Sequence, residues 1–368
     1  MNKEEVSLLF GKNKHTYLEG LVSCENPTAF LLGGQGAVGK GQLLRRIDQC
    51  YTLPEGLLSV NGDLYRKEHP ENEILQKDPE TYSEKTQLFS SVFTEGFISE
   101  AIRNRYNICV EGTMRNPSTP MGTAALFHKN GFRVEAYVIA APKEVSSLNI
   151  YTRYAREMQV FGTGRLADKA SHDAAVEGMP ESLDMLYRSK AVDAIRIYTC
   201  FAKEKIRDYC LTESGWNDSV LPSAVIGEAR QKQLQDNTFL GDILERSLVI
   251  EYAVTDRNIL GRAWEVRNKI AGLLPQDMLH RIALSGPEKE TVRNSLDYLS
   301  GKKGSPWIRS SFEKLCKSLN MGKRDMEKVK NSVLARCSML LNDLTALDRL
   351  ARIYATLPDR DMPRKLKR

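Results

Sequence analysis

The sequence predicts an α/β fold, with a parallel sheet of about five strands flanked by helices and a mainly α-helical C-terminal region after it. Three observations support this prediction. Short runs rich in β-branched residues alternate with segments that could form helices, a glycine-rich loop follows the first run, and the strand pattern largely stops after residue 211. Alternation of this kind is typical of a parallel sheet with helices on both faces.

Composition describes an ordinary globular protein of 368 residues, 41% hydrophobic and 27% charged, and the length favours two structural units. No apolar run approaches the roughly 18 residues of a membrane helix, and the acidic start is unlike a signal peptide. We therefore expect a cytoplasmic protein that does not enter membranes. The seven cysteines form no CxxC pair and the five histidines form no HExxH motif, which argues against disulfide and zinc frameworks.

The expected strands are the apolar runs at residues 29–32, 57–60, 107–110, 134–139 and 195–198. Ligands of such sheets gather at the carboxyl ends of the strands. Polar or glycine-rich segments follow four of the runs at that end: Gly33-Gly34, Asn61-Gly62-Asp63, Glu111-Gly112-Thr113 and Ala141-Pro142. The sequence therefore predicts a site at this edge of the sheet.

The chain divides into a predicted α/β domain at residues 1–211 and a mainly helical region at 212–368. Residues 212–222 are rich in turn-forming residues and indicate a linker. Apolar positions at helical spacing predict a long amphipathic helix over 324–357, preceded by a hinge at 301–306 and followed by a frayed basic tail at 364–368.

A GxxxxGK pattern runs from Gly34 to Lys40, between the first expected strand and a helical segment. In that context the glycines let backbone N–H groups surround phosphates, and the lysine reaches the β- and γ-phosphates of a nucleotide. Gly41 stands where the motif usually carries the Ser or Thr that binds Mg²⁺, so another oxygen must hold the metal. The expected ATP-binding residues are Gly34, Gln35, Gly36, Ala37, Val38, Gly39, Lys40, Gly41 and Gln42.

Asp63 follows the second strand, where a carboxylate could accept a proton from a substrate hydroxyl or bind Mg²⁺. Its alternative role is the N-cap of the following helix. The third strand ends in Glu111, Thr113 and Arg115, which bring a carboxylate, a hydroxyl and a guanidinium to the same edge. Alone, this group could equally be a polar turn.

Six motifs, in this order, resemble those of the zeta toxin family of bacterial kinases over residues 28–200: GGQGAVGK, NGDLYRKEHP, VEGTMRNP, TRY, TGR and SHD. The resemblance implies a P-loop kinase fold and transfer of phosphate from ATP to the 3′-hydroxyl of the amino sugar of UDP-N-acetylglucosamine. It also implies toxicity through loss of cell-wall precursor, and a small helical antitoxin that covers the nucleotide site.

The resemblance assigns Lys40 to the phosphate loop, Asp63 to catalytic-base chemistry, and Glu111, Thr113 and Arg115 to the UDP-sugar. It assigns Arg153 and Arg165 to charge stabilisation on the transferring phosphoryl group, for which arginine is well suited. Glycines beside Arg165 suit a mobile lid. His172 and Asp173 are expected only to cap the next helix.

Two other functions stay open at this point. The same fold could phosphorylate NAD or another nucleotide 3′-hydroxyl, because the shape of the pocket decides the acceptor. A catalytically inactive ATP-binding or partner-binding module is the third hypothesis, supported only by Gly41. No stretch of basic residues interleaved with aromatics marks a nucleic-acid channel, so we expect no nucleic-acid partner.

Overall fold

The computed structural model describes residues 1–78 and 80–275. The chain forms two compact units, the first made of Met1–Ile150 and Arg165–Gln235, the second of Tyr151–Gly164 and the chain from Asp236 onward. The predicted helix at 324–357, the hinge at 301–306 and the basic tail lie outside the described residues. Of the helices within the described ranges, none has the length and apolar character needed to cross a bilayer.

The first unit is built on a sheet with the strand order β2-β3-β1-β4-β5-β6-β7. Every neighbouring pair from β2 to β5 is parallel, whereas β6 and β7 are antiparallel additions at one edge. The strands are β1 (Thr28–Gly33), β2 (Leu58–Asn61), β3 (Ile108–Glu111), β4 (Arg133–Ala140), β5 (Ala194–Thr199), β6 (Lys205–Thr212) and β7 (Gly215–Trp216).

The predicted α/β architecture is confirmed, and the five expected strands are β1 to β5. The five parallel strands match the predicted parallel sheet of about five strands, and the antiparallel strands β6 and β7 extend it to seven in the described residues. The predicted linker at 212–222 also contains β7. β6 was not predicted because it is rich in charged residues. Asp208 on β6 pairs with Arg196 on β5 at 3.2 Å, so these charges stabilise the added strand.

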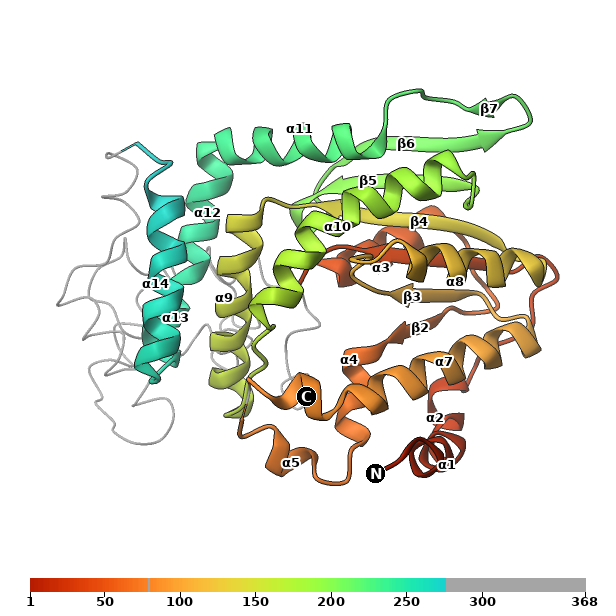
Figure 1. The fold of residues 1–368 in the computed structure, drawn as a ribbon, viewed down its shortest axis with the longest axis horizontal. Coiled ribbons are helices and arrows are strands. Elements are labelled where there is room, and N and C mark those ends of the chain that lie inside the picture. Colours follow the sequence, from red (N-terminus) through yellow and green to blue (C-terminus); the bar gives the residue numbers. More distant parts are fainter. Residues whose placement is uncertain (79, 276–368) are drawn as a thin grey trace, which may run out of the picture. The chain divides into compact units, whose positions relative to one another are not determined.

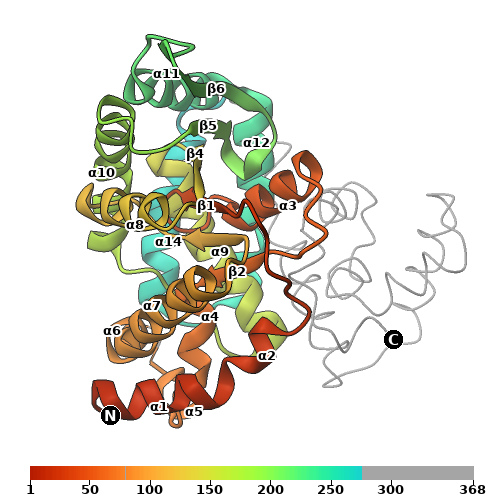
Figure 2. The ribbon, with the colours of Figure 1, turned by 90° about the vertical axis from the view of Figure 1, so that its right-hand side faces the viewer.

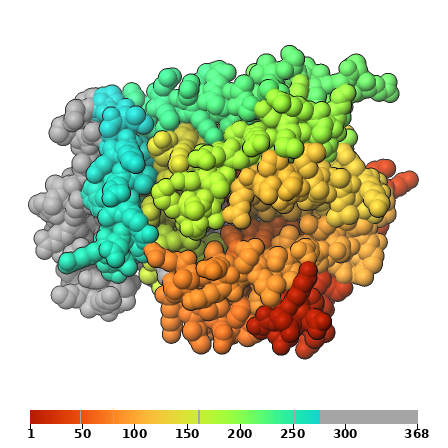
Figure 3. Space-filling view, in the orientation of Figure 1, coloured from red at the N-terminus to blue at the C-terminus, as the bar shows by residue number. Residues whose placement is uncertain are grey.

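Helices cover both faces of this sheet. Figure 2 shows α8 (Ser118–Lys129) and α10 (Lys169–Arg188) on one side of β1, β4 and β5, and α3 (Lys40–Cys50) on the other. In the space-filling view, the side chains of α8 and α10 largely hide the sheet (Figure 3). α11 (Pro222–Gln235) packs against α10 and the strands β4 to β6, and α7 (Gln87–Asn104) packs against β2.

Short helices complete the first unit around α7 (Figure 1). α1 (Lys3–Asn13) is capped by Asn2 in a capping box with Glu5, and it packs against α7. The other elements there are α2 (His15–Leu18), α4 (Gly62–Tyr65), the 3₁₀ turn η1 (Arg66–Glu68), α5 (Asn72–Leu75) and α6 (Tyr82–Lys85). The 3₁₀ turn η2 (Cys200–Ala202) lies against α3 instead.

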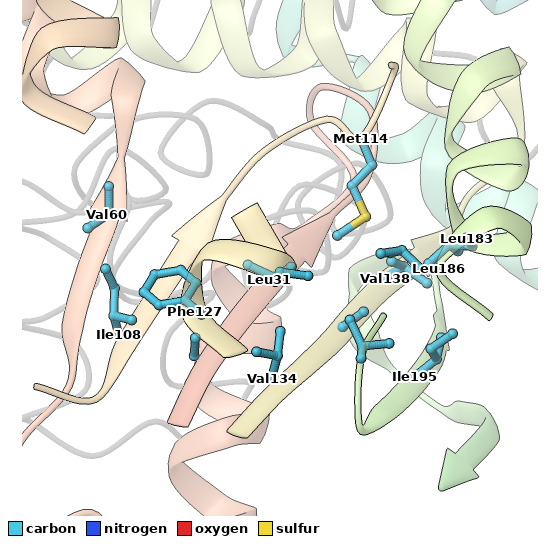
Figure 4. Close-up of a cluster of buried hydrophobic side chains, with 14 of the residues drawn as sticks. Leu31, Val60, Ile108, Met114, Phe127, Val134, Val138, Leu183, Leu186 and Ile195 are labelled. Carbon is cyan, nitrogen blue, oxygen red and sulfur yellow. The ribbon is translucent and has the colours of Figure 1, made fainter. Parts of the chain in front are cut away.

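A hydrophobic core cluster lies between the sheet and the helices on the α8–α10 side (Figure 4). Phe127 of α8 and Leu183 and Leu186 of α10 are buried in it with strand side chains such as Leu31 and Val138. Met114, from the loop after β3, belongs to the same cluster. This loop is therefore fixed by core packing at the edge of the sheet where the site is expected.

The second unit contains the end of α9 (Lys143–Phe161) and the helices α12 (Asn237–Ser247), α13 (Val249–Ala253) and α14 (Arg257–Ala271). Asp236 and Asp256 cap α12 and α14 by accepting hydrogen bonds from backbone N–H groups of their first turns. The described part of this unit is helical, as expected for this region. The domain boundary after residue 211 stays a prediction.

Candidate active site

The glycine-rich loop connects β1 to α3. Gly39 has a φ of +95°, and a Cβ at this position would lie 2.8 Å from the Cα of Phe201, so both the backbone conformation and the available space require glycine. Gly39 is also the N-cap of α3 and has no side chain to cap it. The first-turn N–H groups of α3 thus suit an anion, as the motif predicts.

Lys40 is folded back over this loop. Its Nζ donates hydrogen bonds to the carbonyl oxygens of Gly34 and Gln35, both at 2.9 Å, and lies 3.7 Å from Oε1 of Glu111. The side chain is only 11% exposed. An ammonium group is therefore held against the backbone of the loop, next to the end of β3.

The register of the parallel strands explains why Glu111 lies here. Glu111 pairs with Leu32 on β1 and with Asn61 on β2. Asn61 Nδ2 donates to Glu111 Oε2 at 2.8 Å, and the N–H of Gly112 donates to the carbonyl of Leu32 at 2.9 Å. Lys40, Asn61 and Glu111 thus meet at the carboxyl edge of three neighbouring strands, as the sequence predicts.

Asp63 lies in the short helix α4, directly after β2, and its side chain is 47% exposed. The alternative that Asp63 caps this helix is wrong: Asn61 is the N-cap, and its side chain accepts from the N–H of Asp63 at 3.0 Å. Two arginines flank the Asp63 carboxylate. Arg66 Nε lies 2.9 Å from Oδ1, and Arg165 Nη1 lies 3.7 Å from Oδ2.

Arg66, the nearer of the two arginines, was not among the site residues predicted from the sequence. It is 7% exposed and donates hydrogen bonds to the carbonyl of Ser83 at 2.6 Å and to Thr86 Oγ1 at 3.0 Å. These partners belong to α6 and the start of α7, so Arg66 anchors the Asp63 carboxylate to the protein interior. The i,i+3 spacing of Asp63 and Arg66 was a weak signal for this pair.

The loop after β3 carries Thr113 and Arg115, and α10 holds its backbone. Ser182 Oγ donates to the carbonyl of Met114 at 2.7 Å, and a Cβ at Gly178 would lie 2.0 Å from the carbonyl oxygen of Arg115. The exposed Arg115 donates from Nη1 to Ser171 Oγ at 3.0 Å. This loop therefore lies directly on α10, with Thr113 half-buried.

Arg165 lies in the first unit, beside Asp63, in the segment between α9 and α10. Arg153 lies on the part of α9 that belongs to the second unit, and its Nε is 4.0 Å from Oε1 of Glu157. The proposed action of both arginines on a phosphoryl group stays a prediction.

Gly41 lies in the first turn of α3, and a Cβ there would meet no atom within 4 Å. A serine or threonine would fit, so space does not explain the glycine. No group of three or more His, Cys, Asp or Glu side chains in the described ranges is arranged to hold a metal. Mg²⁺ bound with nucleotide phosphates needs only one or two protein oxygens, and the carboxylates of Asp63 and Glu111 fit that requirement.

The expectation that His172 and Asp173 cap a helix is wrong. α10 begins at Lys169, and Asp168 is the N-cap, accepting from the N–H of Ser171 at 2.7 Å. His172 is instead buried, 4% exposed, and its imidazole contacts Ser146 and Asp173. Sequence alone could not show this role, because Ser146 comes from another helix.

Comparison with known proteins decides the family. The family model described as "Zeta toxin" matches residues 14–213 of this chain. The chain belongs to the zeta toxin family. It is 30% identical over 205 residues to the protein "Toxin zeta" of Enterococcus hirae, an alignment that covers 55% of this chain and 70% of that protein.

A second relative of this chain is "Toxin PezT" of Streptococcus pneumoniae serotype 4. The two are 30% identical over 190 residues, an alignment that covers 51% of this chain and 74% of the relative. Among solved structures, one from the PezAT toxin–antitoxin system of Streptococcus pneumoniae aligns with a TM-score of 0.53 at 20% identity. It covers 74% of this chain and 98% of that one, which supports the shared fold of the zeta toxin family.

Proposed function

We propose that this protein is a kinase that transfers the γ-phosphate of ATP to the 3′-hydroxyl of the amino sugar of UDP-N-acetylglucosamine or a related UDP-sugar. The observation that carries the proposal is the convergence of Lys40, Glu111 and the Asp63–Arg165 pair at one edge of the sheet. A phosphate loop, a carboxylate and an arginine are the groups that phosphoryl transfer requires. Membership of the zeta toxin family agrees with this assignment.

In the proposed reaction the loop from Gly34 to Lys40 binds the ATP phosphates through backbone N–H groups and the Lys40 ammonium. Glu111, Thr113 and Arg115 bind the UDP-sugar. The sugar oxygen forms a bond to the γ-phosphorus while the bond from that phosphorus to the bridging oxygen breaks, and ADP leaves. Asp63 accepts the hydroxyl proton, and Arg165 and Arg153 stabilise the charge on the phosphoryl oxygens.

Mg²⁺, held by Asp63 or Glu111, would neutralise phosphate charge in this reaction. Two features of Asp63 suit its role as base. Arg66 fixes the orientation of the carboxylate from the buried side, and the 47% exposure of Asp63 leaves it accessible to a substrate. Oriented reacting groups are a main source of rate enhancement when little covalent chemistry is involved.

Phosphorylated UDP-sugar would be withheld from cell-wall synthesis, so we propose that the protein acts in the cytoplasm as a bacterial toxin restrained by a small helical antitoxin. Two findings support this: the relatives are named as toxins, and the aligned solved structure comes from a toxin–antitoxin system. Under this proposal, toxicity depends on phosphate transfer and not on binding alone.

Expression from an inducible promoter in bacteria tests this dependence. Wild type is expected to arrest growth, and Asp63→Asn, which removes the base while keeping the side-chain shape, is expected to permit it. Asp236→Asn is the matched control, because an amide oxygen can still cap α12. Equal arrest by wild type and Asp63→Asn at equal protein levels would refute the mechanism.

A further inference from the structure

A chain of buried polar side chains connects the phosphate loop to the start of α10. Gln35 Nε2 lies 3.3 Å from Ser146 Oγ, which lies 2.8 Å from His172 Nε2. His172 Nδ1 lies 3.0 Å from Asp173 Oδ1. Gln35 and Ser146 are both 0% exposed and His172 is 4% exposed, so the chain crosses the protein interior away from water.

The donors and acceptors of this chain can be assigned in one direction. Asp173 accepts hydrogen bonds as a carboxylate, so His172 Nδ1 carries the proton and His172 Nε2 is left as an acceptor. Ser146 then accepts from the amide of Gln35, and its single hydroxyl hydrogen can be donated to His172, in competition with the carbonyls of Pro142 and Lys143. Burial lowers the pKa of His172, which agrees with a neutral imidazole of this tautomer.

Charge fixes the far end of the chain. Asp173 Oδ2 lies 2.5 Å from Nζ of Lys169 and 3.2 Å from Nζ of Lys143. Burial alone would raise the pKa of Asp173, but the hydrogen bonds from Lys169, His172 and Lys143 outweigh it and hold that pKa far below its usual value. The carboxylate is therefore a permanent acceptor for His172 near neutral pH.

The order Ser146, His172, Asp173 resembles a hydrolytic triad, but its surroundings exclude that role. Ser146 is fully buried, and its Oγ also lies 3.1 Å from the carbonyl oxygens of Pro142 and Lys143. A nucleophile must reach a substrate, whereas this hydroxyl is surrounded by protein. The chain can thus act only on the protein itself.

The near end of the chain determines how the phosphate loop is held. The two hydrogens of the Gln35 amide are directed at Ser146 Oγ and at the carbonyl of Ala141, the latter at 2.8 Å. The backbone carbonyl of Gln35 is also one of the two hydrogen-bond partners of Lys40 Nζ. Gln35 therefore links the chain to the position of the loop backbone and of the lysine.

The neighbouring residue on α10 contacts a different loop. Ser171 Oγ accepts from Arg115 Nη1 at 3.0 Å, and Arg115 lies in the loop assigned to the UDP-sugar. Ser171 and His172 are adjacent in sequence, yet they contact different regions. Ser171 contacts the loop that carries Arg115, and His172 is linked to the phosphate loop through Ser146. The first turn of α10 thus reaches both substrate regions.

We infer that His172 is a positioning residue for the phosphate loop, acting through Ser146 and Gln35, and that Ser171 positions Arg115 for the acceptor. The Ser171-His172-Asp173 motif would then set the geometry of two binding regions from one helix turn. The inference rests on the proposed function in two respects, that the loop from Gly34 to Lys40 binds ATP and that the loop carrying Arg115 binds the acceptor.

Binding of ATP to the full chain, measured by isothermal titration calorimetry, tests the inference without requiring catalysis. His172→Phe keeps a ring of similar size but removes both hydrogen bonds, and we expect it to raise the Kd for ATP by about tenfold, the scale of one or two lost hydrogen bonds. His172→Gln, whose amide can both donate and accept, is expected to restore part of the affinity. His128→Phe is the matched control, because His128 also pairs with a carboxylate, Asp193, at 3.0 Å.

The KM values of the transfer reaction provide the second measurement. We expect His172→Phe to leave the KM for the UDP-sugar within about twofold of wild type, and Ser171→Ala to raise that KM while leaving the Kd for ATP unchanged. A purely structural role would change both constants together in both variants. If His172→Phe fails to fold, Ser146→Ala, which removes a single hydroxyl, carries the same expectation for ATP.

The outcomes separate the inference from the proposed function. ATP binding that is lost in Lys40→Ala but unchanged in His172→Phe and Ser146→Ala would overturn the inference alone. Wild-type protein that binds no ATP would overturn the proposed function, and the inference with it. Weakened ATP binding in His172→Phe, together with an unchanged acceptor KM, is the expected result.

Discussion

Gly178 on α10 offers a sharp test of how the loop after β3, which carries Thr113 and Arg115, is held. A Cβ built at this position lies 2.0 Å from the carbonyl oxygen of Arg115, 2.8 Å from its carbonyl carbon and 3.2 Å from its Cα. All three are backbone atoms, so no side-chain rotation can relieve the overlap. Gly178→Ala must therefore move the Arg115 backbone, the helix, or both.

The size of the effect follows from the distances. Carbon–oxygen contacts normally begin near about 3.3 Å, so the loop must shift by about 1 Å or more. Overpacking of this kind costs about 1–3 kcal/mol, and the better helix propensity of alanine offsets about 1 kcal/mol of it. We expect a net loss of up to about 2 kcal/mol in the free energy of unfolding. A displacement of about 1 Å in a substrate-binding loop can lower kcat/KM by about a hundredfold.

Chemical denaturation and the kcat/KM for the UDP-sugar measure the two effects. Gly227→Ala on α11 is the matched control, because a Cβ there meets no atom within 4 Å. That variant should be as active as wild type and at least as stable. Gly178→Ala with the stability and kcat/KM of Gly227→Ala would refute the argument that α10 fixes this loop.

Three further predictions concern the metal, the base and pH. Gly41→Ser should lower the Mg²⁺ concentration for half-maximal rate, because a Cβ fits at this position and serine adds an oxygen ligand. Gly41→Ala adds no oxygen and should leave that concentration unchanged. The same Mg²⁺ concentration for half-maximal rate in both variants would show that the metal is held without residue 41. Arg66→Lys should lower kcat by about tenfold, because lysine cannot hydrogen-bond to Asp63, Ser83 and Thr86 together. Arg103 is exposed, and Arg103→Lys should leave kcat unchanged. Equal kcat values in the two variants would contradict the role of Arg66. Burial lowers the pKa of His172 in the folded protein. As pH falls below about 6.5, the unfolded chain therefore binds a proton at this residue before the folded protein does. The free energy of unfolding should fall in this range by at most about 1.4 kcal/mol per pH unit. His172→Phe should flatten this slope in denaturation curves, and an unchanged slope would contradict the assignment.

Much of the fold could be predicted because its signals are local. The strands β1 to β5 are apolar runs bounded by turn residues, and parallel strands necessarily bring their carboxyl ends to one edge. Lys40, Asp63 and Glu111 could be placed there for that reason. β6 was missed because it is rich in charged residues, one of which, Asp208, pairs with Arg196 on the neighbouring strand, a contact that periodicity cannot reveal.

The parts of the site that could not be predicted depend on contacts between distant segments. Arg66 is meaningful only once α6 and α7 supply its acceptors, and His172 only once Ser146 of α9 approaches it. Both sit in sequence positions where a solvated arginine or a helix cap would be ordinary. Gly178 likewise gave no signal, since nothing in the helical pattern shows that the backbone of Arg115 lies against it.

Phosphate transfer to a defined acceptor tests the central claim most directly. Purified protein, ATP and Mg²⁺ would be incubated with UDP-N-acetylglucosamine, with other UDP-sugars and NAD in parallel, and the product identified by mass spectrometry and ³¹P NMR. We predict a 3′-phosphorylated UDP-amino sugar from wild type and none from Lys40→Ala or Asp63→Asn. Transfer to NAD alone would contradict the proposed acceptor, and no Lys40-dependent transfer to any acceptor would contradict the kinase mechanism.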